Sequence, residues 1–399
     1  MGISIPANRL ICNFLNSLDF YAALPPTIKK HIIAILTAMA IKGFTAKMTD
    51  IEEVSDCHRT TISRFLSDSR WEDKPIKSAI KQTAFQHIQQ LSKETGAPVF
   101  FSLDDTVNVK TKPSSQAERP IEMAGFHHSH LLNKQVWGHQ VMATMVGCGD
   151  TVLNYDIHRY DKTVQTKIEY AQELIKELPA PETESYFLTD SWYANTKIIN
   201  ACKKKGYSFI GALKTNRIIY PGCGSETNGL HISIADFAAK HIGNHNVSLV
   251  TVNKKDYYVH RYVGKLNGIK RAVVLISWPA AAFKNPKALN AFICTNTSLD
   301  TSTILEYYSK RWPIETFFGQ SKDALGFGKY QIRSIKGIDR LWTLMSLCHL
   351  MCSIGLGDNM AFGDGLRFLR KDISKDKISF IYQGAQNRVP LEKLYTLCA

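Results

Sequence analysis

The chain has 399 residues, of which 44% are hydrophobic and 21% are charged, and its formal net charge is +14. This balance is typical of a globular protein with two or three domains, and it excludes collagen-like and intrinsically disordered chains. The excess of 49 basic over 35 acidic residues favours a polyanionic partner, and DNA and RNA come first among these.

The first predicted domain covers residues 1–92 and is helical, with a helix-turn-helix at about 49–68. Thr49 and Glu52 have the spacing of a capping box at the start of its first helix. The second helix starts at His58, with apolar residues on one side and polar residues on the other. Such a helix can enter a DNA major groove, although any small three-helix bundle has the same pattern. The polar residues that would face the groove are Arg59, Thr60, Ser63 and Arg64.

The second predicted domain, residues 96–215, is the first part of an α/β core. A buried-strand run at 98–103 is followed by a hairpin, a helix, a second buried strand at 185–189, a basic helix and a third strand at 207–213. This order predicts a mixed five-stranded sheet with helices on its faces, which is the RNase H-like arrangement.

The remaining sequence changes character twice. Residues 216–296 alternate β-prone pieces with turns of Gly, Asn and Lys, and we predict a β-rich insertion there. Helical character returns in residues 297–360, predicted as the second part of the core, and residues 361–399 form a basic C-terminal tail. The expected fold is therefore α/β, with an all-α N-terminal DNA-binding domain and a β-rich insertion.

Acidic residues stand at the ends of two of the buried strands: Asp104 or Asp105 after the first, and Asp190 after the second. A carboxylate in this position is costly unless it is compensated. Neighbouring central strands would bring the two acids within reach of one ion, and hard oxygen ligands with open water positions suit Mg²⁺. Aspartate is also common in ordinary strand-end turns, so these positions alone do not define a metal site.

A third acidic residue belongs to a row of four polar residues in a helical segment. Their offsets from the first are 3, 7 and 14, which at about 100° per residue places all four within a stripe of roughly 60°. Such a row can lay a carboxylate, two cations and a phenol along one phosphate backbone. Pro313 interrupts the segment, so we expect the carboxylate-bearing helix to begin near Trp312. The four residues are Tyr308, Arg311, Glu315 and Lys322.

The spacing Tyr-x₂-Arg-x₃-Glu-x₆-Lys resembles the signature of the bacterial insertion-sequence transposases with the YREK motif, within the RNase H-like transposase/integrase superfamily. The LDDT box at Leu103 and the TDSWY box at Thr189 resemble that family too, over roughly residues 99–345. The resemblance implies two Mg²⁺ ions, replaceable by Mn²⁺, held by the catalytic residues Asp104, Asp190 and Glu315. It also implies DNA contacts from Tyr308, Arg311, Trp312 and Lys322.

The first catalytic carboxylate has two possible assignments. The family's first motif often reads Asp-x-Thr, which selects Asp104 with Thr106 two residues later. An alignment on Asp-Thr directly selects Asp105 instead. Strand alternation does not decide between them, because a central strand is buried on both faces. Asp104 is the preferred assignment.

Further residues have a functional interpretation and a structural one. In the resembled family the insertion helps to hold the DNA end, sometimes by base stacking, for which Trp278, Tyr257 and Tyr258 are candidates; the alternative is packing of the insertion's own sheet. The basic run at 203–205 could steer DNA, or it is solvated surface charge.

The histidine cluster is interpreted as a DNA-facing or hydrogen-bonding loop, with a metal site as the alternative. Its members are His127, His128 and His130.

The resemblance implies a DNA transposase of an insertion sequence, a homodimer that binds terminal inverted repeats and target DNA and catalyses cut-and-paste transposition. The alternatives are a catalytically inactive or domesticated descendant that only binds DNA, and a host nuclease of the same fold. Nine scattered cysteines with no CxxC pair indicate a reducing compartment. No signal peptide and no apolar run of membrane-spanning length is evident, so we expect a bacterial cytoplasmic protein associated with the nucleoid.

Overall fold

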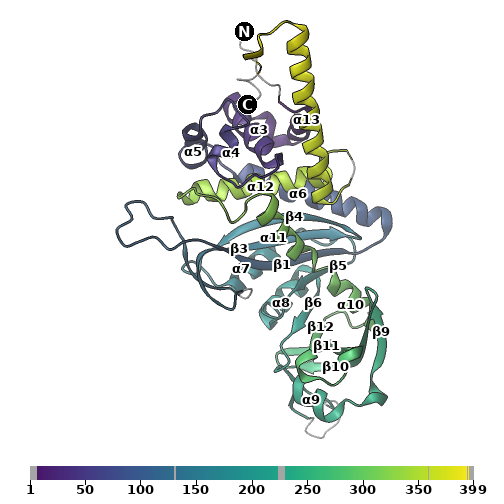
Figure 1. Ribbon diagram of the computed structural model, residues 1–399. Helices are drawn as coiled ribbons and strands as arrows, with labels where there is room; N and C mark the ends of the chain where they lie inside the picture. Colours follow the sequence, from purple (N-terminus) through teal and green to yellow (C-terminus); the bar gives the residue numbers. More distant parts are fainter. Residues whose placement is uncertain (1–6, 130–131, 223–229, 358, 393, 395–399) are drawn as a thin grey trace.

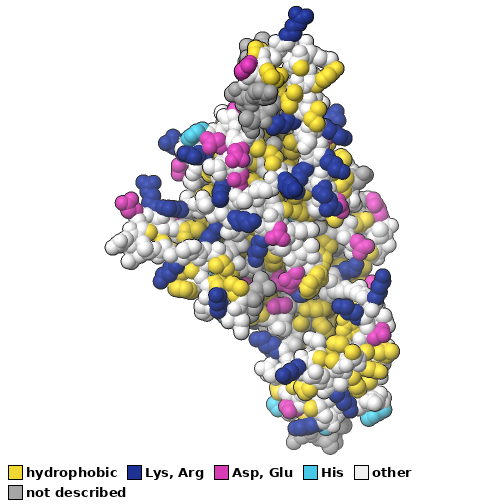
Figure 2. Space-filling view, viewed as in Figure 1, with side chains coloured by type: hydrophobic (Ala, Val, Ile, Leu, Met, Phe, Trp, Pro, Cys, Tyr) yellow, Lys and Arg dark blue, Asp and Glu magenta, His cyan; other side chains and the backbone are white. Residues whose placement is uncertain are grey.

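The protein is a mixed α/β structure built around one large sheet (Figure 1). Helices lie on both sides of the sheet, and the N-terminal helices form a separate layer at the upper end of the view. Lys and Arg side chains are spread over the whole face shown in Figure 2. None of the described helices combines the length and apolar character needed to cross a bilayer. The computed structural model describes residues 7–129, 132–222, 230–357, 359–392 and 394.

The N-terminal helices pack around a shared apolar core. Ile11, Ile35 and Leu66 from three of them are fully buried. The last of these helices ends at Gly96, whose positive φ of 72° favours glycine. The helices before the first strand are α1 (Arg9–Asn16), α2 (Asp19–Ala22), α3 (Pro26–Ala40), α4 (Met48–Glu52), α5 (Arg59–Ser67) and α6 (Lys74–Thr95).

The capping box predicted from Thr49 and Glu52 is wrong. Helix α4 begins at Met48, and the Asp50 carboxylate caps it by accepting a hydrogen bond from the backbone N–H of the N-cap residue Lys47 at 3.3 Å. Glu52 serves the next helix instead, because its Oε1 accepts from the backbone N–H of Arg59 at 3.2 Å. The short turn between the two helices is thereby fixed by a side chain from α4.

The sheet has twelve described strands, ordered β2-β3-β1-β5-β6-β12-β11-β10-β7-β8, with β4 beside β3 and β9 beside β10. Strands β1, β5 and β6 run parallel, while β3 is antiparallel to β1 and to β4. In the register of β1 with β5, Leu103 lies opposite Thr189. The strands of this half are β1 (Val99–Val109), β2 (Gly125–Ser129), β3 (Lys134–Cys148), β4 (Thr151–Tyr160), β5 (Ser185–Thr189) and β6 (Ser208–Leu213).

The segment predicted as a β-rich insertion extends the same sheet, because β12 pairs antiparallel with β6. Its described residues also include the α-helix α9 (Ile234–His241) and 3₁₀ turns at Asn244–Asn246, Ala280–Ala282 and Pro286–Ala288. Its strands are β7 (Ile218–Ile219), β8 (Ile232–Ser233), β9 (Ser248–Val252), β10 (Lys255–Leu266), β11 (Ile269–Pro279) and β12 (Asn290–Cys294).

Strand β1 is packed on both faces, and its residues alternate between them. Phe101 points toward α6, with its ring 6.2 Å from that of Phe85. Phe100 points the other way and meets Tyr307 of α10 at 5.0 Å. The consecutive residues Asp104 and Asp105 therefore face opposite sides of the sheet.

The remaining helices complete the layers. Helices α7 and α8 connect the parallel strands, and α12 lies between the sheet and the N-terminal helices (Figure 1). The segment expected as a basic tail contains a 25-residue helix, α13, which projects away from the sheet. These helices are α7 (Lys167–Glu177), α8 (Thr196–Lys205), α10 (Thr301–Ser309), α11 (Pro313–Ala324), α12 (Ile335–Ile354) and α13 (Phe362–Gln386).

Candidate active site

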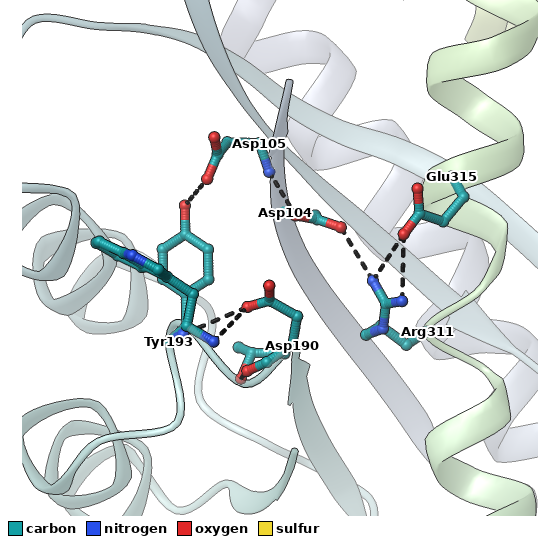
Figure 3. A network of polar contacts seen from close by, with 8 residues as sticks. Asp104, Asp105, Asp190, Tyr193, Arg311 and Glu315 are labelled. Atoms are coloured by element: carbon teal, nitrogen blue, oxygen red, sulfur yellow. Dashed lines mark hydrogen bonds and ion pairs between the residues drawn. The ribbon is translucent and has the colours of Figure 1, made fainter. Parts of the chain in front are cut away.

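Two acidic residues occupy adjacent positions on neighbouring strands of the sheet. Leu103 of β1 lies opposite Thr189 of β5, and the next residue on each chain is an aspartate, Asp104 and Asp190. Because β1 and β5 are parallel, both acids lie at the same edge of the sheet. Helix α11 packs against β1 and brings Glu315 to the same place (Figure 3).

Arg311 joins two of these carboxylates. Its Nη1 donates to Asp104 Oδ2 at 2.9 Å, and both Nη1 and Nη2 donate to Glu315 Oε1 at 3.2 Å. Arg311 and Glu315 are four residues apart on either side of Pro313, and α11 begins at that proline, where its missing N–H needs no partner. The structure therefore brings together Asp104, Asp190, Arg311 and Glu315.

The cluster contains more negative charge than Arg311 neutralises. Burial, and then the charge of Asp190, raise the pKa of Asp104 to about 7, although Arg311 opposes the shift. Burial raises the pKa of Asp190 as well, and the backbone N–H groups of Tyr193 and Trp192, which donate to its Oδ1 at 3.3 and 3.0 Å, reduce that effect. A bound cation would relieve the unfavourable charge.

Asp105 has a different environment on the opposite face of β1. It accepts hydrogen bonds from the Tyr193 hydroxyl at 2.6 Å and the Lys167 ammonium at 2.8 Å, and another from the Gln140 amide. Both of its oxygens are therefore engaged by groups of the protein. Tyr193 also belongs to the turn that carries Asp190, so its hydrogen bond to Asp105 holds that turn in place (Figure 3).

The other members of the polar row follow the same face of β1. Lys322 Nζ donates to Thr106 Oγ1 at 2.7 Å, and burial lowers the pKa of Lys322. The Tyr308 ring packs on Phe292, and the Arg311 guanidinium lies 5.9 Å from the centre of that tyrosine ring. The neighbouring Trp312 is 65% exposed at the rim of the cluster.

The donor set fits a divalent cation in its chemistry. Asp104, Asp190 and Glu315 offer hard carboxylate oxygens of the kind that Mg²⁺ binds, at a place with excess negative charge. Within the part of the chain that the structure describes, no three acidic, His or Cys side chains are already spaced to share an ion. The guanidinium of Arg311 holds Asp104 and Glu315 instead.

The groove-facing residues predicted on α5 lie far from the carboxylates, in the N-terminal layer (Figure 1). The inner side of α5 is fixed to α12, because the buried Arg340 donates to the backbone oxygens of Phe65 and Leu66. On the outer side, Ser63 is half-buried and three residues are exposed. The exposed residues are Arg59, Thr60 and Arg64.

The aromatic residues proposed for base stacking are integrated into the sheet. Trp278 is only 2% exposed and its ring lies 5.5 Å from that of Phe283. A side chain so buried is part of the core and offers no face to a base. Tyr257 and Tyr258 are half-buried on β10.

The histidine cluster is divided between different environments. On β2, His127 is buried and His128 is exposed, and His130 lies outside the described residues. The further histidine His139 is buried, with its Nδ1 2.7 Å from the Tyr330 hydroxyl. The contacts of His139 are those of a hydrogen-bonded histidine in a packed sheet.

Sequence reasoning missed the residues that surround Asp105. Tyr193 was visible within the TDSWY box, but nothing in the sequence linked it to a carboxylate 88 positions earlier. Lys167 also lies 4.9 Å from the ring centre of Trp192, which is 38% exposed next to Asp190. Such partners become visible only when α7 and β5 are placed beside β1.

Residues 108–351 match the family described as "Transposase DDE domain", and this segment is more than half of the chain. The chain therefore belongs to the transposase DDE domain family. The matched segment includes Asp190 and Glu315, and it begins after Asp104 and Asp105.

Two solved structures are similar to the chain at low identity. A cryo-EM structure of the piggyBac transposase synaptic complex with hairpin DNA is 11% identical, with a TM-score of 0.47 over 98% of this chain and 85% of that one. The crystal structure of the Mos1 strand transfer complex is 13% identical, with a TM-score of 0.17 over 47% of this chain and 59% of that one. No curated protein matches the sequence.

Proposed function

We propose that this protein is a DNA transposase of an insertion sequence, of the YREK-signature group, which cuts and joins DNA at the cluster of Asp104, Asp190 and Glu315. The observation that carries the proposal is the convergence of these acids with Arg311 from β1, β5 and α11. The family membership supports it. Its partners would be terminal inverted repeats and target DNA, bound by a homodimer in the bacterial cytoplasm at the nucleoid.

We infer that the half-sheet β4-β3-β1-β5-β6 is an RNase H-like core, because an antiparallel meander of β1, β3 and β4 is continued on the other side of β1 by the parallel strands β5 and β6. In this division residues 96–215 and 297–360 build the core, and 216–296 are an insertion that extends its sheet. Residues 1–92 would bind DNA through α5, and 361–399 would form the C-terminal element.

The proposed catalytic set is Asp104, Asp190 and Glu315, with Asp104 preferred to Asp105 because three protein donors already hold Asp105. Two Mg²⁺ or Mn²⁺ ions bound there would supply an activated water and stabilise the leaving 3′ oxygen of a phosphodiester. Arg311 would release Glu315 and pair with a DNA phosphate, for which its planar fork is suited. Tyr308, Trp312 and Lys322 would hold the strand beside it.

The test replaces Glu315 by the isosteric amide, Glu315→Gln, and measures Mg²⁺-dependent cleavage of a duplex that carries the inverted repeat flanking the gene. We expect cleavage to fall by about three orders of magnitude or more, since metal-assisted catalysis is worth several kcal/mol. Binding of the same duplex should remain. The matched control is Glu306→Gln, at an exposed position of α10, which should cleave normally.

Two outcomes would contradict the proposal. Normal cleavage by Glu315→Gln would remove Glu315 from the catalytic set. A wild-type chain that binds the repeat, but does not nick it with Mg²⁺ or Mn²⁺, would be a DNA-binding descendant without catalysis.

A further inference from the structure

Helices α7 and α8 line an open basic cavity that the catalytic proposal does not use. Its volume is about 380 Å³, and six of its seven lining residues have side chains that donate hydrogen bonds. No carboxylate is among the described residues that line it. The lining residues are Gln172, Lys176, Lys197, Asn200, Ala201, Lys204 and Lys205.

The two helices run in the same direction, from the edge of the sheet that carries the carboxylates toward the opposite edge. Both are crossovers between parallel strands, so their N-terminal ends lie where the strands end. At that edge Lys167, the first residue of α7, binds Asp105. At the other end, Lys205 Nζ donates to the carbonyl oxygen of Lys176 at 2.8 Å, which holds the C-terminal ends together. The cavity therefore extends toward the C-terminal ends of the two helices, away from the carboxylates.

The lysines around the cavity lack close carboxylate partners among the described residues. Among the described residues, none of its four lysines forms an ion pair with a carboxylate within 4 Å. Of the acidic residues of α7, Glu169 lies on the same stripe as Gln172 and Lys176, but its carboxylate caps the helix by accepting hydrogen bonds from the backbone N–H and the hydroxyl of Thr166, both at 2.8 Å. The cavity therefore presents unpaired positive charge to an approaching anion.

We propose that this cavity binds the phosphate backbone of duplex DNA outside the site of cleavage. Lysine ammonium groups and amide donors contact phosphate oxygens without reading the bases, and no aromatic residue lines the cavity for base stacking. From Lys197 to Lys204 helix α8 rises by about 10 Å, which corresponds to about three base-pair steps. The proposal rests on the proposed function, because that function makes DNA the partner.

Sequence reasoning treated the basic run 203–205 as one unit, but the structure separates its members. Lys204 and Lys205 line the cavity, whereas the exposed Lys203 does not. Lys203 is therefore a matched control on the same helix. A second control is Lys240, which is exposed on α9.

The experiment compares the double variant Lys176→Ala/Lys204→Ala with the control Lys203→Ala/Lys240→Ala. Metal-free binding to a duplex of unrelated sequence is measured by fluorescence anisotropy between about 50 and 200 mM salt. We expect the cavity variant to lose affinity by about tenfold, and the slope of log K against log salt to fall by about two, one for each lost phosphate contact. The control should keep the wild-type slope, and both variants should keep the wild-type melting temperature because all four lysines are exposed.

An unchanged slope in the cavity variant, with a wild-type chain that binds the duplex, would overturn this inference and leave the proposed function standing. Inorganic tripolyphosphate serves as the second probe. If the cavity variant loses tripolyphosphate binding but keeps its duplex affinity, the cavity is a site for small anions and the inference is wrong. A wild-type chain that binds no duplex would overturn both proposals.

Discussion

Asp104 and Asp105 are neighbours in sequence, yet they have opposite environments on the two faces of β1. Asp105 is held by a hydroxyl, an amide and an ammonium group, which satisfy its charge. Asp104 faces the like charge of Asp190 and shares Arg311 with Glu315, and its pKa is raised to about 7. Asp105 therefore stabilises the fold, whereas the charge of Asp104 lowers the stability of the fold.

This difference favours Asp104 over Asp105 as the proposed catalytic acid. A folded protein tolerates an uncompensated buried carboxylate mainly where a ligand will compensate it, so perturbed acids concentrate at functional sites. Protein groups already compensate the charge of Asp105, whereas a bound cation would compensate the charge of Asp104. Changes made separately at the two residues should therefore have separable effects on activity and stability.

The largest expected effect is on DNA cleavage. Asp104→Asn should reduce Mg²⁺-dependent cleavage by about three orders of magnitude or more, because it removes a proposed metal ligand. Asp105→Asn should reduce it by less than about tenfold, through a slight displacement of the turn that carries Asp190. Single-turnover cleavage of an end-containing duplex measures both variants. The opposite ranking would make Asp105 the catalytic acid and reverse the comparison.

Much of the site could be predicted from local pattern. Glu315 and Arg311 are close in sequence, and helical spacing was enough to place them on one face. Asp104 and Asp190 are far apart, but each follows a buried strand, which marks the edge where parallel strands end. The choice between Asp104 and Asp105 was not accessible in this way, because it depends on Lys167 and other partners from distant elements.

The fold shows the same division between local and long-range information. The strand and helix order of residues 96–215 followed from hydrophobic periodicity. The pairing of β12 with β6, which makes the insertion part of the central sheet, joins segments about 80 residues apart and has no local signal. The 25-residue helix α13 lies within the segment that was expected to be a basic tail. It was not predicted because a mostly polar helix that buries few residues has only weak hydrophobic periodicity.

The next expected effect is on stability, with opposite signs at the two acids. In metal-free buffer at pH 8, Asp105→Asn should lower the free energy of unfolding by about 3 kcal/mol, because the Lys167 ammonium, whose side chain is only 13% exposed, loses its partner. Asp104→Asn should raise it by about 1–2 kcal/mol, because it removes a charge that opposes both burial and Asp190. Urea unfolding in EDTA measures both, and destabilisation by Asp104→Asn would contradict the contrast.

The smallest expected effect is a gradual change of the free energy of unfolding with pH, caused by the titration of Asp104. The folded protein holds the Asp104 proton up to a pKa of about 7, whereas the unfolded chain releases it near the ordinary value of 3.8. Below pH 4 both states are protonated and the residue costs nothing. Between about pH 4 and 7 only the unfolded chain loses its proton, so stability falls as pH rises, by a total of about 1–2 kcal/mol over this interval. Above pH 7 the cost is constant.

Asp104→Asn lacks this titration, so its stability advantage over the wild type should be absent near pH 4, grow toward pH 7 and then level off. Unfolding curves of the two proteins in EDTA, taken in half-unit steps of pH, measure the difference directly. Parallel curves across the whole range would mean that Asp104 keeps an ordinary pKa in the folded state. Saturating Mg²⁺ adds a control, because an ion that holds Asp104 ionised should remove the wild-type disadvantage at pH 7 and above and leave the variant unchanged.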